Sequence, residues 1–419
     1  MAVPSEWVRS AVGATIVRFR TGGVPELARA ALIGGVTCLP WSIAVAQISI
    51  TLALLAWAVS AVRRGRRVGW RHPLLGWWLA FAVLAVISAV RGWRPELSVP
   101  KLHRLAWFFL MIAVADLART DPSSPTQFLV RIVRGLWVGC GVAWIAHAGQ
   151  LAWAVTHVPP NVSFSFWVFH QGSMRTPQFH MVALIFLLAG AGVGGWDLAR
   201  GLRLGVGALN LLGVFWHFKR GVWMATLFGW VALAVSGCRV RRDRAWVVAG
   251  LMLLALTIGP VRTRLCAAAA DVMCPGGRWE LWTKAAPEIV RKAPWGIGYG
   301  AMKNYELRHR VPHVEAKLNH LHNNALQVLA EIGWPGLIVW VGWMTHMLIL
   351  MARAVQRRCK WGGDGAALAR GVWASAVALL MNGLVEYNFG TGTILIWFAV
   401  QMGMVAVLAS EPTNKENAT

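Results

Sequence analysis

Acidic residues are scarce in this chain of 419 residues, where 17 Asp and Glu stand against 41 Lys and Arg. No two carboxylates form an Asp-x-Asp pair, so the sequence predicts no metal-diphosphate site of the usual carboxylate type and no metal cofactor. The six cysteines show no zinc-site spacing. The sequence also lacks three motifs of common enzyme classes: a GKS or GKT phosphate loop, a GxSxG nucleophile elbow and a dinucleotide fingerprint after a strand. The sequence therefore predicts chemistry that needs no cofactor.

Hydrophobic residues make up 57% of the chain, which also contains 26 Trp, values that a soluble domain of this length would not reach. We predict an all-α integral membrane protein with about twelve transmembrane helices, counted as apolar runs of about 20 residues. The runs lie at 27–43, 44–62, 73–90, 105–118, 129–152, 180–196, 204–218, 221–237, 245–260, 334–352, 371–389 and 391–409.

The net charge of +24 is concentrated in alternate loops, a distribution that argues against nucleic-acid binding. Under the positive-inside rule these loops and both termini are cytoplasmic. The basic residues are Arg63, Arg64, Arg66, Arg67 and Arg71, then Arg200 and Arg203, then Arg239, Arg241, Arg242 and Arg244, and finally Arg353, Arg357, Arg358 and Lys360.

All the long loops then lie on the opposite, outer face. Residues 1–260 are predicted to hold nine spans, 261–333 one large outer loop, 334–410 three further spans and 411–419 a cytoplasmic tail. Loops as long as 261–333 usually have structure of their own.

Helical periodicity in the large outer loop places Trp279, Trp282, Ala286, Ile289 and Val290 on one face, with Pro287 marking a kink or a new start. The Gly-rich stretch PWGIGYG at 294–300 breaks this helix, and a polar helix over 303–310 is expected to follow. The sequence leaves open whether Cys266 and Cys274 of this loop form a disulfide or are two isolated thiols.

Two further outer segments, 91–104 and 153–179, carry basic residues whose part in binding the sequence leaves open. They are Arg94, Lys101, His103, Arg104 and Arg175.

Residues 320–336, HLHNNALQVLAEIGWPG, place two histidines before a short apolar helix. Asn323 or Asn324 is expected to cap this helix, and Gly333 to end it before Pro335 opens the next. Because a helix N-terminus disfavours an imidazolium, His322 should tend to remain neutral and able to accept a proton. The alternative is that His320 and His322 are ordinary polar loop residues.

Lys219 and Arg220 stand between two apolar runs with almost no loop, at the predicted outer mouth of the membrane. Basic residues are disfavoured on that side, so an anionic substrate is their natural partner; ordinary snorkelling is the alternative. Arg278 follows Gly276 and Gly277 at the start of a predicted helix. Backbone amides and a guanidinium there would suit a phosphate, although a solvated loop arginine is the alternative.

Two of these motifs resemble those of a known family. His322 and Asn323, followed after nine residues by Gly333 and after two more by Gly336, resemble the histidine motif of the O-antigen ligases. These enzymes belong with the O-antigen polymerases and related bacterial membrane glycosyltransferases. Arg220 followed by Met224 is similar to the family's arginine motif, which usually has Leu at the second position.

Arg278 and Trp282, followed by the glycine-rich 294–300 stretch, look like the start of the family's large periplasmic loop. The resemblance implies a C-type glycosyltransferase fold in the bacterial inner membrane, with the active site on the periplasmic face. It also implies a donor, undecaprenyl-diphosphate-linked O-antigen polysaccharide, and an acceptor, a sugar hydroxyl of lipid A core. The product would be full-length lipopolysaccharide, formed without metal or nucleoside triphosphate and with inversion of the anomeric centre.

Within that resemblance, we expect His322 to take the acceptor proton while Arg220 and Arg278 hold the departing diphosphate. His320, Lys219, Arg175 and Asn323 are secondary candidates. The alternatives are an O-antigen polymerase, a protein-directed oligosaccharyltransferase, a lipid-linked oligosaccharide transporter and a membrane scaffold.

Overall fold

The computed structural model describes residues 23–63, 65, 72–157, 175–191, 200–217, 219–236, 257, 259–266, 272–273, 277–305 and 320–410. Every regular element over these residues is a helix. Five helical segments are long and apolar enough to cross a membrane, so the chain is a multi-pass membrane protein. They are Ile43–Arg63, Pro95–Arg119, Pro125–Gln150, Asn324–Cys359 and Gly363–Asn382.

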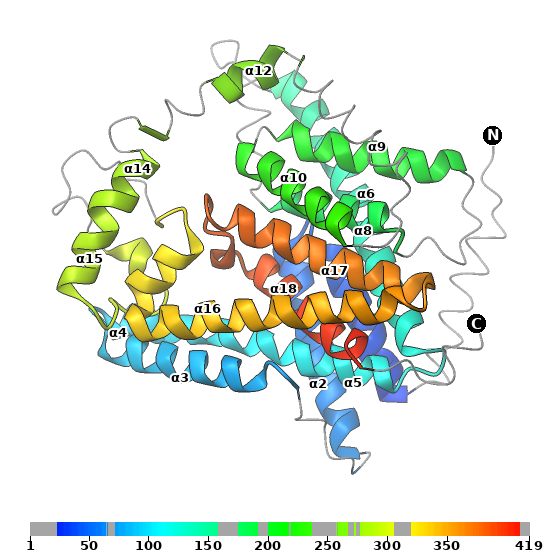
Figure 1. Cartoon of the computed structure of the whole chain (residues 1–419), viewed down its shortest axis with the longest axis horizontal. Helices are drawn as coiled ribbons and strands as arrows, with labels where there is room; N and C mark the ends of the chain where they lie inside the picture. The colour runs from blue at the N-terminus through cyan, green and yellow to red at the C-terminus, as the bar shows by residue number, and fades with distance from the viewer. Residues whose placement is uncertain are drawn as a thin grey trace.

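The core of the bundle is a row of neighbouring helices, α3, α16, α17 and α10, which Figure 1 shows one above the other. On this row, α8 packs against α17 and α9, and α18 packs against α5. Small residues permit the closest contacts: a Cβ at Gly403 of α18 would lie 2.6 Å from Val114 Cβ of α5. The bounds are α3 Leu75–Arg91, α5 Phe109–Arg119, α8 Thr176–Ala189, α9 Arg200–Trp216, α10 Arg220–Val235, α16 Asn324–Cys359, α17 Gly363–Asn382 and α18 Gly392–Leu408.

The structure differs from the sequence prediction before α5. The stretch 91–104 was expected to be an outer loop, but α4 (Pro95–Ser98) and the 3-10 helix η1 (Val99–Phe108) lead directly into α5. Prolines in the first turn of both elements start them, because the fixed φ of proline suits that position. The segment of membrane length therefore begins at Pro95 rather than near residue 105.

Other predicted runs have described counterparts of different length. α2 is Ile43–Arg63 and α6 is Pro125–His157, and a helix over 23–38 precedes α2. The predicted run 245–260 lies mostly outside the described residues. The helices α3, α8, α10 and α18 are shorter apolar helices than the five candidate spans.

The segment between α10 and α16 contributes, over its described residues, most of a small core that is separate from the core of the bundle. Its helix over the predicted amphipathic stretch has a π-helical turn, η2 (Leu281–Ala285), between α14 (Arg278–Glu280) and α15 (Ala286–Lys292). Because a π-turn lengthens the repeat, Leu281 and Ala285 enter the core while Trp279 is 49% exposed. The prediction that Trp279 shares the buried face is wrong.

Pro287 lies in the first turn of α15, where the π-turn ends and the α-helix resumes without a break. The sequence predicted a kink or a new start at this proline. A 3-10 helix, η3 (Ala301–Asn304), covers the beginning of the predicted polar helix over 303–310, most of which lies outside the described residues. The segment also contains α12 (Gly259–Cys266). Cys266 is a free, exposed cysteine, and Cys274 lies outside the described residues.

The glycine-rich turn over 294–300 contacts the first part of α16 at the point where that part ends. Helix α16 bends at Gly333, whose φ is 79°, as the predicted helix end required. The amides of Ile297 and Gly298 donate to the carbonyls of Ala330 and Glu331, and Trp334 N–H donates to Pro294 O. These bonds satisfy carbonyls that the bend removes from the helical pattern. A Cβ at Gly333 would lie 2.4 Å from Pro294 O, so only glycine fits this contact.

Candidate active site

The loop that carries the two histidines is fixed at Leu321. Its N–H donates to Gln327 Oε1 over 2.8 Å, and its carbonyl accepts from the indole of Trp282 over 2.8 Å. The next residue, His322, has a φ of 50°, in the left-handed region that side chains rarely adopt. Such a conformation costs free energy and persists where surrounding contacts hold it, often at functional sites.

Asn323 caps α16, as predicted: its Oδ1 accepts from Leu326 N–H over 3.0 Å. Its Nδ2 also donates to Leu384 O over 2.9 Å, so this side chain ties the histidine loop to the segment after α17. Asn324 adds two further ties, from its N–H to Gly383 O and from its Nδ2 to Asn388 Oδ1. The histidine loop and residues 383–388 therefore form one unit.

The segment after α17 does not continue the helix that the sequence predicted. The sequence predicted a single apolar run over 371–389, but α17 ends at Asn382 and a turn follows. Gly383 supports this arrangement, because a Cβ there would lie 2.2 Å from Asn324 Nδ2. The early end of α17 places Glu386 in the turn, beside the histidines.

Glu386 joins the predicted residues into one cluster. His322 Nδ1 lies 3.1 Å from Glu386 Oε1, and Arg278 donates from Nη2 to Glu386 Oε2 over 3.2 Å. His320 Nε2 lies 4.0 Å from Glu386 Oε1. The side chain of Glu386 is 9% exposed, against 20% for His322 and 33% for Arg278. Three segments far apart in the sequence thus meet on one buried carboxylate.

The electrostatics of the cluster favour an ionised Glu386. Burial by itself raises the pKa of this carboxyl, but the hydrogen bond from His322 and the charges of His322, Arg278 and His320 together lower it below the ordinary value. An ionised carboxylate can accept hydrogen bonds but cannot donate them, so His322 Nδ1 carries the proton of this hydrogen bond. In the neutral imidazole the lone pair is then on Nε2, the nitrogen that would accept a proton.

His320 stays neutral at physiological pH. Burial, with smaller contributions from the neighbouring His322 and Arg278, lowers the pKa of its imidazole to about 4, against the opposing effect of Glu386. Its ring packs edge-on against His322, with ring centroids 4.1 Å apart. Nδ1 of His320 is buried with no hydrogen-bond partner.

The cluster also offers a set of metal ligands that the sequence did not reveal. One atom each from His320, His322 and Glu386 lie within 4.8 Å of one another. Imidazole and carboxylate groups suit several transition metals. The expectation of no metal site rested on spacing within short motifs, and Glu386 is 64 residues from His322 along the chain.

Arg220 begins α10, and Lys219 precedes it as the N-cap. The helix start lies against the turn after α17, because a Cβ at Gly221 would lie 2.9 Å from Asn382 Oδ1 and 3.0 Å from Val385 Cγ2. Both side chains are half-buried. The fold therefore brings the start of α10 beside the segment that leads to Glu386.

Three other basic residues have partners away from the cluster. Arg175 donates to Trp41 O over 3.1 Å, and Lys101 Nζ donates to Gly300 O in the glycine-rich turn. The guanidinium of Arg94 lies over the Trp93 ring, 4.5 Å from its centroid. Arg175, a secondary candidate, is thus tied to the loop before α2.

The sequence prediction missed Glu386, although a signal was present. A single Glu inside an apparent membrane run is costly unless it has a partner, and such residues often mark functional sites. Because the run 371–389 was read as a span, this carboxylate was not counted with the outer acidic residues.

Comparison with known families gives one match: residues 205–341 match a family model described as O-antigen ligase. The matched segment contains Arg220, Arg278 and His322, whereas Glu386 lies beyond it. A comparison with curated proteins found no match.

Proposed function

We propose, from the match of residues 205–341 to the O-antigen ligase family model, that this chain belongs to the family of O-antigen ligases and polymerases and is an O-antigen ligase. It transfers polysaccharide from undecaprenyl diphosphate to a sugar hydroxyl of lipid A core, at the periplasmic face of the bacterial inner membrane. The observation that supports this most is the cluster in which Glu386 joins His322 and Arg278. It provides a base, an orienting carboxylate and a cation at one place.

In the proposed reaction, the acceptor hydroxyl oxygen attacks the anomeric carbon of the donor sugar. The new glycosidic bond forms as the bond to the diphosphate oxygen breaks, so the anomeric centre inverts and the electron pair leaves with undecaprenyl diphosphate. The acceptor proton moves to His322 Nε2. Glu386 holds the ring by its bond to Nδ1–H and stabilises the imidazolium that forms.

Arg278 and Arg220 would stabilise the diphosphate, where negative charge accumulates as the glycosyl bond breaks. Arg278 begins α14 and Arg220 begins α10, so helix N-terminal amides lie near both guanidiniums. Lys219 is placed to add positive charge beside Arg220. We assign Asn323 and His320 the task of positioning His322, and the proposed transfer uses no metal.

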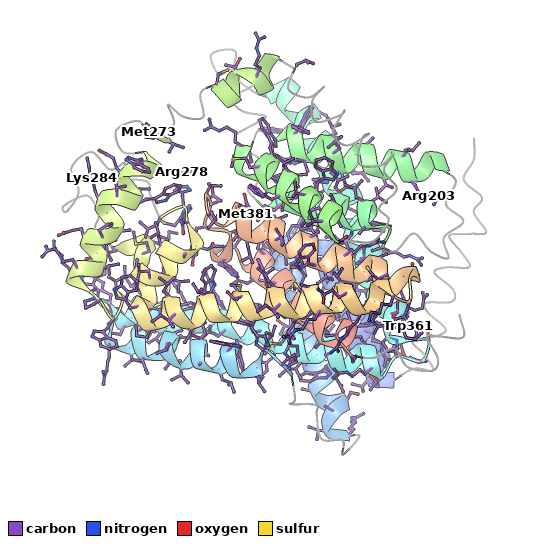
Figure 2. All side chains as sticks on the ribbon, viewed as in Figure 1. Arg203, Met273, Arg278, Lys284, Trp361 and Met381 are labelled. Carbon is purple, nitrogen blue, oxygen red and sulfur yellow. The ribbon has the colours of Figure 1, made fainter. Side chains whose placement is uncertain are left out.

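The arrangement of the bundle supports a topology with this site outside and the basic loops in the cytoplasm. Figure 2 places Arg278 and Met381 toward one end of the molecule, and Arg203 and Trp361 toward the other. Arg203 and Trp361 belong to stretches rich in Arg and Lys, which the positive-inside rule assigns to the cytoplasm. We extend this to about twelve spans, a C-type glycosyltransferase fold, the large periplasmic loop over 261–333 and cytoplasmic termini.

An O-antigen polymerase is the second candidate, since the family includes both activities. It would use the same donor with a second lipid-linked glycan as acceptor. A transporter has less support: its polar groups would lie near the middle of paired, broken helices, whereas the His322 cluster lies in loops at helix ends.

Reconstitution of the purified chain tests the proposal. The full-length protein in lipid vesicles would receive a lipid-linked polysaccharide donor together with either lipid A core or a second lipid-linked glycan. Product on lipid A core supports the ligase, and extended lipid-linked polymer supports the polymerase. Movement of donor across the vesicle membrane, with no product on either acceptor, would contradict both.

A further inference from the structure

Three ligand atoms of His320, His322 and Glu386 form a compact triangle. His322 Nδ1 and Glu386 Oε1 are 3.1 Å apart, His320 Nε2 and Glu386 Oε1 are 4.0 Å apart, and the whole set lies within 4.8 Å. Zinc binds His nitrogen and carboxylate oxygen at about 2.0–2.2 Å. Tetrahedral angles at those bond lengths separate two ligand atoms by about 3.3–3.6 Å. Two of the observed separations, 3.1 and 4.0 Å, lie on either side of that value, and the whole set lies within 4.8 Å, so shifts of about an ångström would close the triangle around an ion.

His320 has unused hydrogen-bonding capacity on both ring nitrogens. Its Nδ1 is buried without a hydrogen-bond partner, and its Nε2 is too far from Glu386 to form a normal hydrogen bond. Nε2, the nitrogen that faces Glu386, is therefore available to an ion. In the proposed reaction His320 takes no proton; its part there is to position His322.

We propose that His320, His322 and Glu386 form a binding site for Zn²⁺ and similar transition-metal ions, and that a bound ion inhibits the enzyme. The inhibitory part rests on the proposed function of His322. The binding part does not. Three protein ligands with one open position is a common arrangement for zinc in proteins.

The inhibition follows from the two nitrogens of His322. In the metal-free site Nδ1–H donates to Glu386 and Nε2 has the lone pair that accepts the acceptor proton. An ion can bind Nδ1 only through a lone pair on that nitrogen. The proton of the neutral ring must therefore move from Nδ1 to Nε2. Nε2–H can donate a hydrogen bond but can no longer accept a proton. The ion therefore converts the base into a donor without removing any residue.

Arg278 affects how strongly the site binds a metal ion, and the ligand types determine which ion it prefers. Its guanidinium pairs with Glu386 Oε2 over 3.2 Å, so a metal ion must compete with an existing cation. Two imidazoles and one carboxylate suit Zn²⁺, Cu²⁺ or Ni²⁺, whereas Mg²⁺ prefers six oxygen ligands. We expect Zn²⁺ to bind and Mg²⁺ not to compete with it.

The test of binding uses the full-length chain in detergent, purified without a polyhistidine tag. Competition with a chromophoric chelator measures Zn²⁺ affinity and stoichiometry, and Co²⁺ absorption in the wild-type protein reports ligand geometry. His320→Ala and Glu386→Gln should each weaken Zn²⁺ binding at least about tenfold. Arg278→Gln should strengthen it, because the competing cation is lost. His103→Ala, an exposed outer histidine, is the matched control and should leave it unchanged.

His147 and His217 form the alternative location, since their Nε2 atoms lie 2.9 Å apart in the bundle. Binding that disappears in His217→Ala and persists in His320→Ala would overturn the proposed site. The absence of any wild-type Zn²⁺ binding, or of a tetrahedral Co²⁺ spectrum, would also overturn it. Gel filtration of each variant separates loss of ligand from loss of fold.

Transfer assays in the same vesicles test inhibition. Saturating Zn²⁺ should abolish transfer, and EDTA should restore it. His320→Ala should lose the sensitivity to Zn²⁺, so that the transfer this variant performs is the same with Zn²⁺ and with EDTA. Full transfer with the site occupied would overturn the inhibitory part. A chain that binds Zn²⁺ as described but transfers no glycan under any condition would contradict the proposed function and leave the binding site standing.

Discussion

Two buried carboxylates, Asp121 and Glu386, each pair with arginine, and they serve different ends. Asp121 is 1% exposed and lies 3.4 Å from Arg29 Nε, with Arg131 as a second partner. Arg29 also donates to the carbonyls of Leu117 and Thr120 at the end of α5. Most groups in that cluster therefore close a helix end or balance a charge, although Arg131 Nε is buried without a hydrogen-bond partner.

The Glu386 cluster uses the same kinds of group but leaves some capacity unused. One carboxylate faces one arginine and two imidazoles, and His320 Nδ1 has no hydrogen-bond partner. His322 is also held in a left-handed backbone conformation. A cluster with strain and unmet hydrogen-bonding capacity is suited to a ligand or a reaction, whereas a closed cluster is suited to stability.

The largest expected effect is the loss of His322. His322→Ala should abolish transfer with normal expression and an unchanged melting temperature, because no other group in the cluster has a lone pair placed by Glu386. Transfer measured in reconstituted vesicles checks this, with His103→Ala as control. Near-normal turnover would remove His322 from the mechanism.

Glu386→Gln should lower the turnover number by about 10²-fold to 10⁴-fold, the range associated with general acid–base catalysis. The amide keeps the size of the side chain but removes the charge that stabilises an imidazolium at His322. Glu288→Gln, on α15 of the outer segment, is the matched control. A variant as active as the control would show that Glu386 has a structural part only, like Asp121.

Arg278→Ala and Arg220→Ala should each slow transfer by about 2–4 kcal/mol in transition-state free energy, if they meet charge that develops on the diphosphate. Steady-state kinetics with varied donor measure this. An unchanged rate for Arg278→Ala would mean that its pairing with Glu386 is its whole function.

The opposite result is expected for the closed cluster. Asp121→Ala removes the buried carboxylate that Arg29 and Arg131 share, leaves Arg29 with Glu26 as its anionic partner and should destabilise the fold by about 1–3 kcal/mol. Thermal unfolding in detergent would show the lower melting temperature, while transfer per folded molecule below that temperature stays near wild type. A large loss of transfer in correctly folded protein would break the contrast between the two clusters.

The smallest effect is expected from metal removal. Excess EDTA should leave transfer unchanged or raise it where traces of Zn²⁺ are present, because the proposed displacement uses no metal. Complete loss of activity that added Mg²⁺ restores would contradict this mechanism.

Local patterns predicted much of the histidine loop correctly. The cap at Asn323 and the bend at Gly333 were both predicted, because a cap and a left-handed glycine depend on neighbouring residues. The π-turn at Leu281–Ala285 was not predicted. It changes which residues of the helix face the small core, and this change depends on the packing against that core rather than on neighbouring residues. Trp279 was misplaced for this reason.

The sequence by itself determined that the chain is helical and membrane-embedded, since runs of apolar residues have no other stable arrangement in a bilayer. It also marked Arg220, Arg278 and His322 as residues of interest, because basic and imidazole groups stand out in apolar surroundings. Only the tertiary structure decided that Glu386 orients His322 and pairs with Arg278. That contact depends on where α17 ends and on the hydrogen bonds that join Asn323 and Asn324 to the following turn, and such long-range contacts leave no periodic pattern in the sequence.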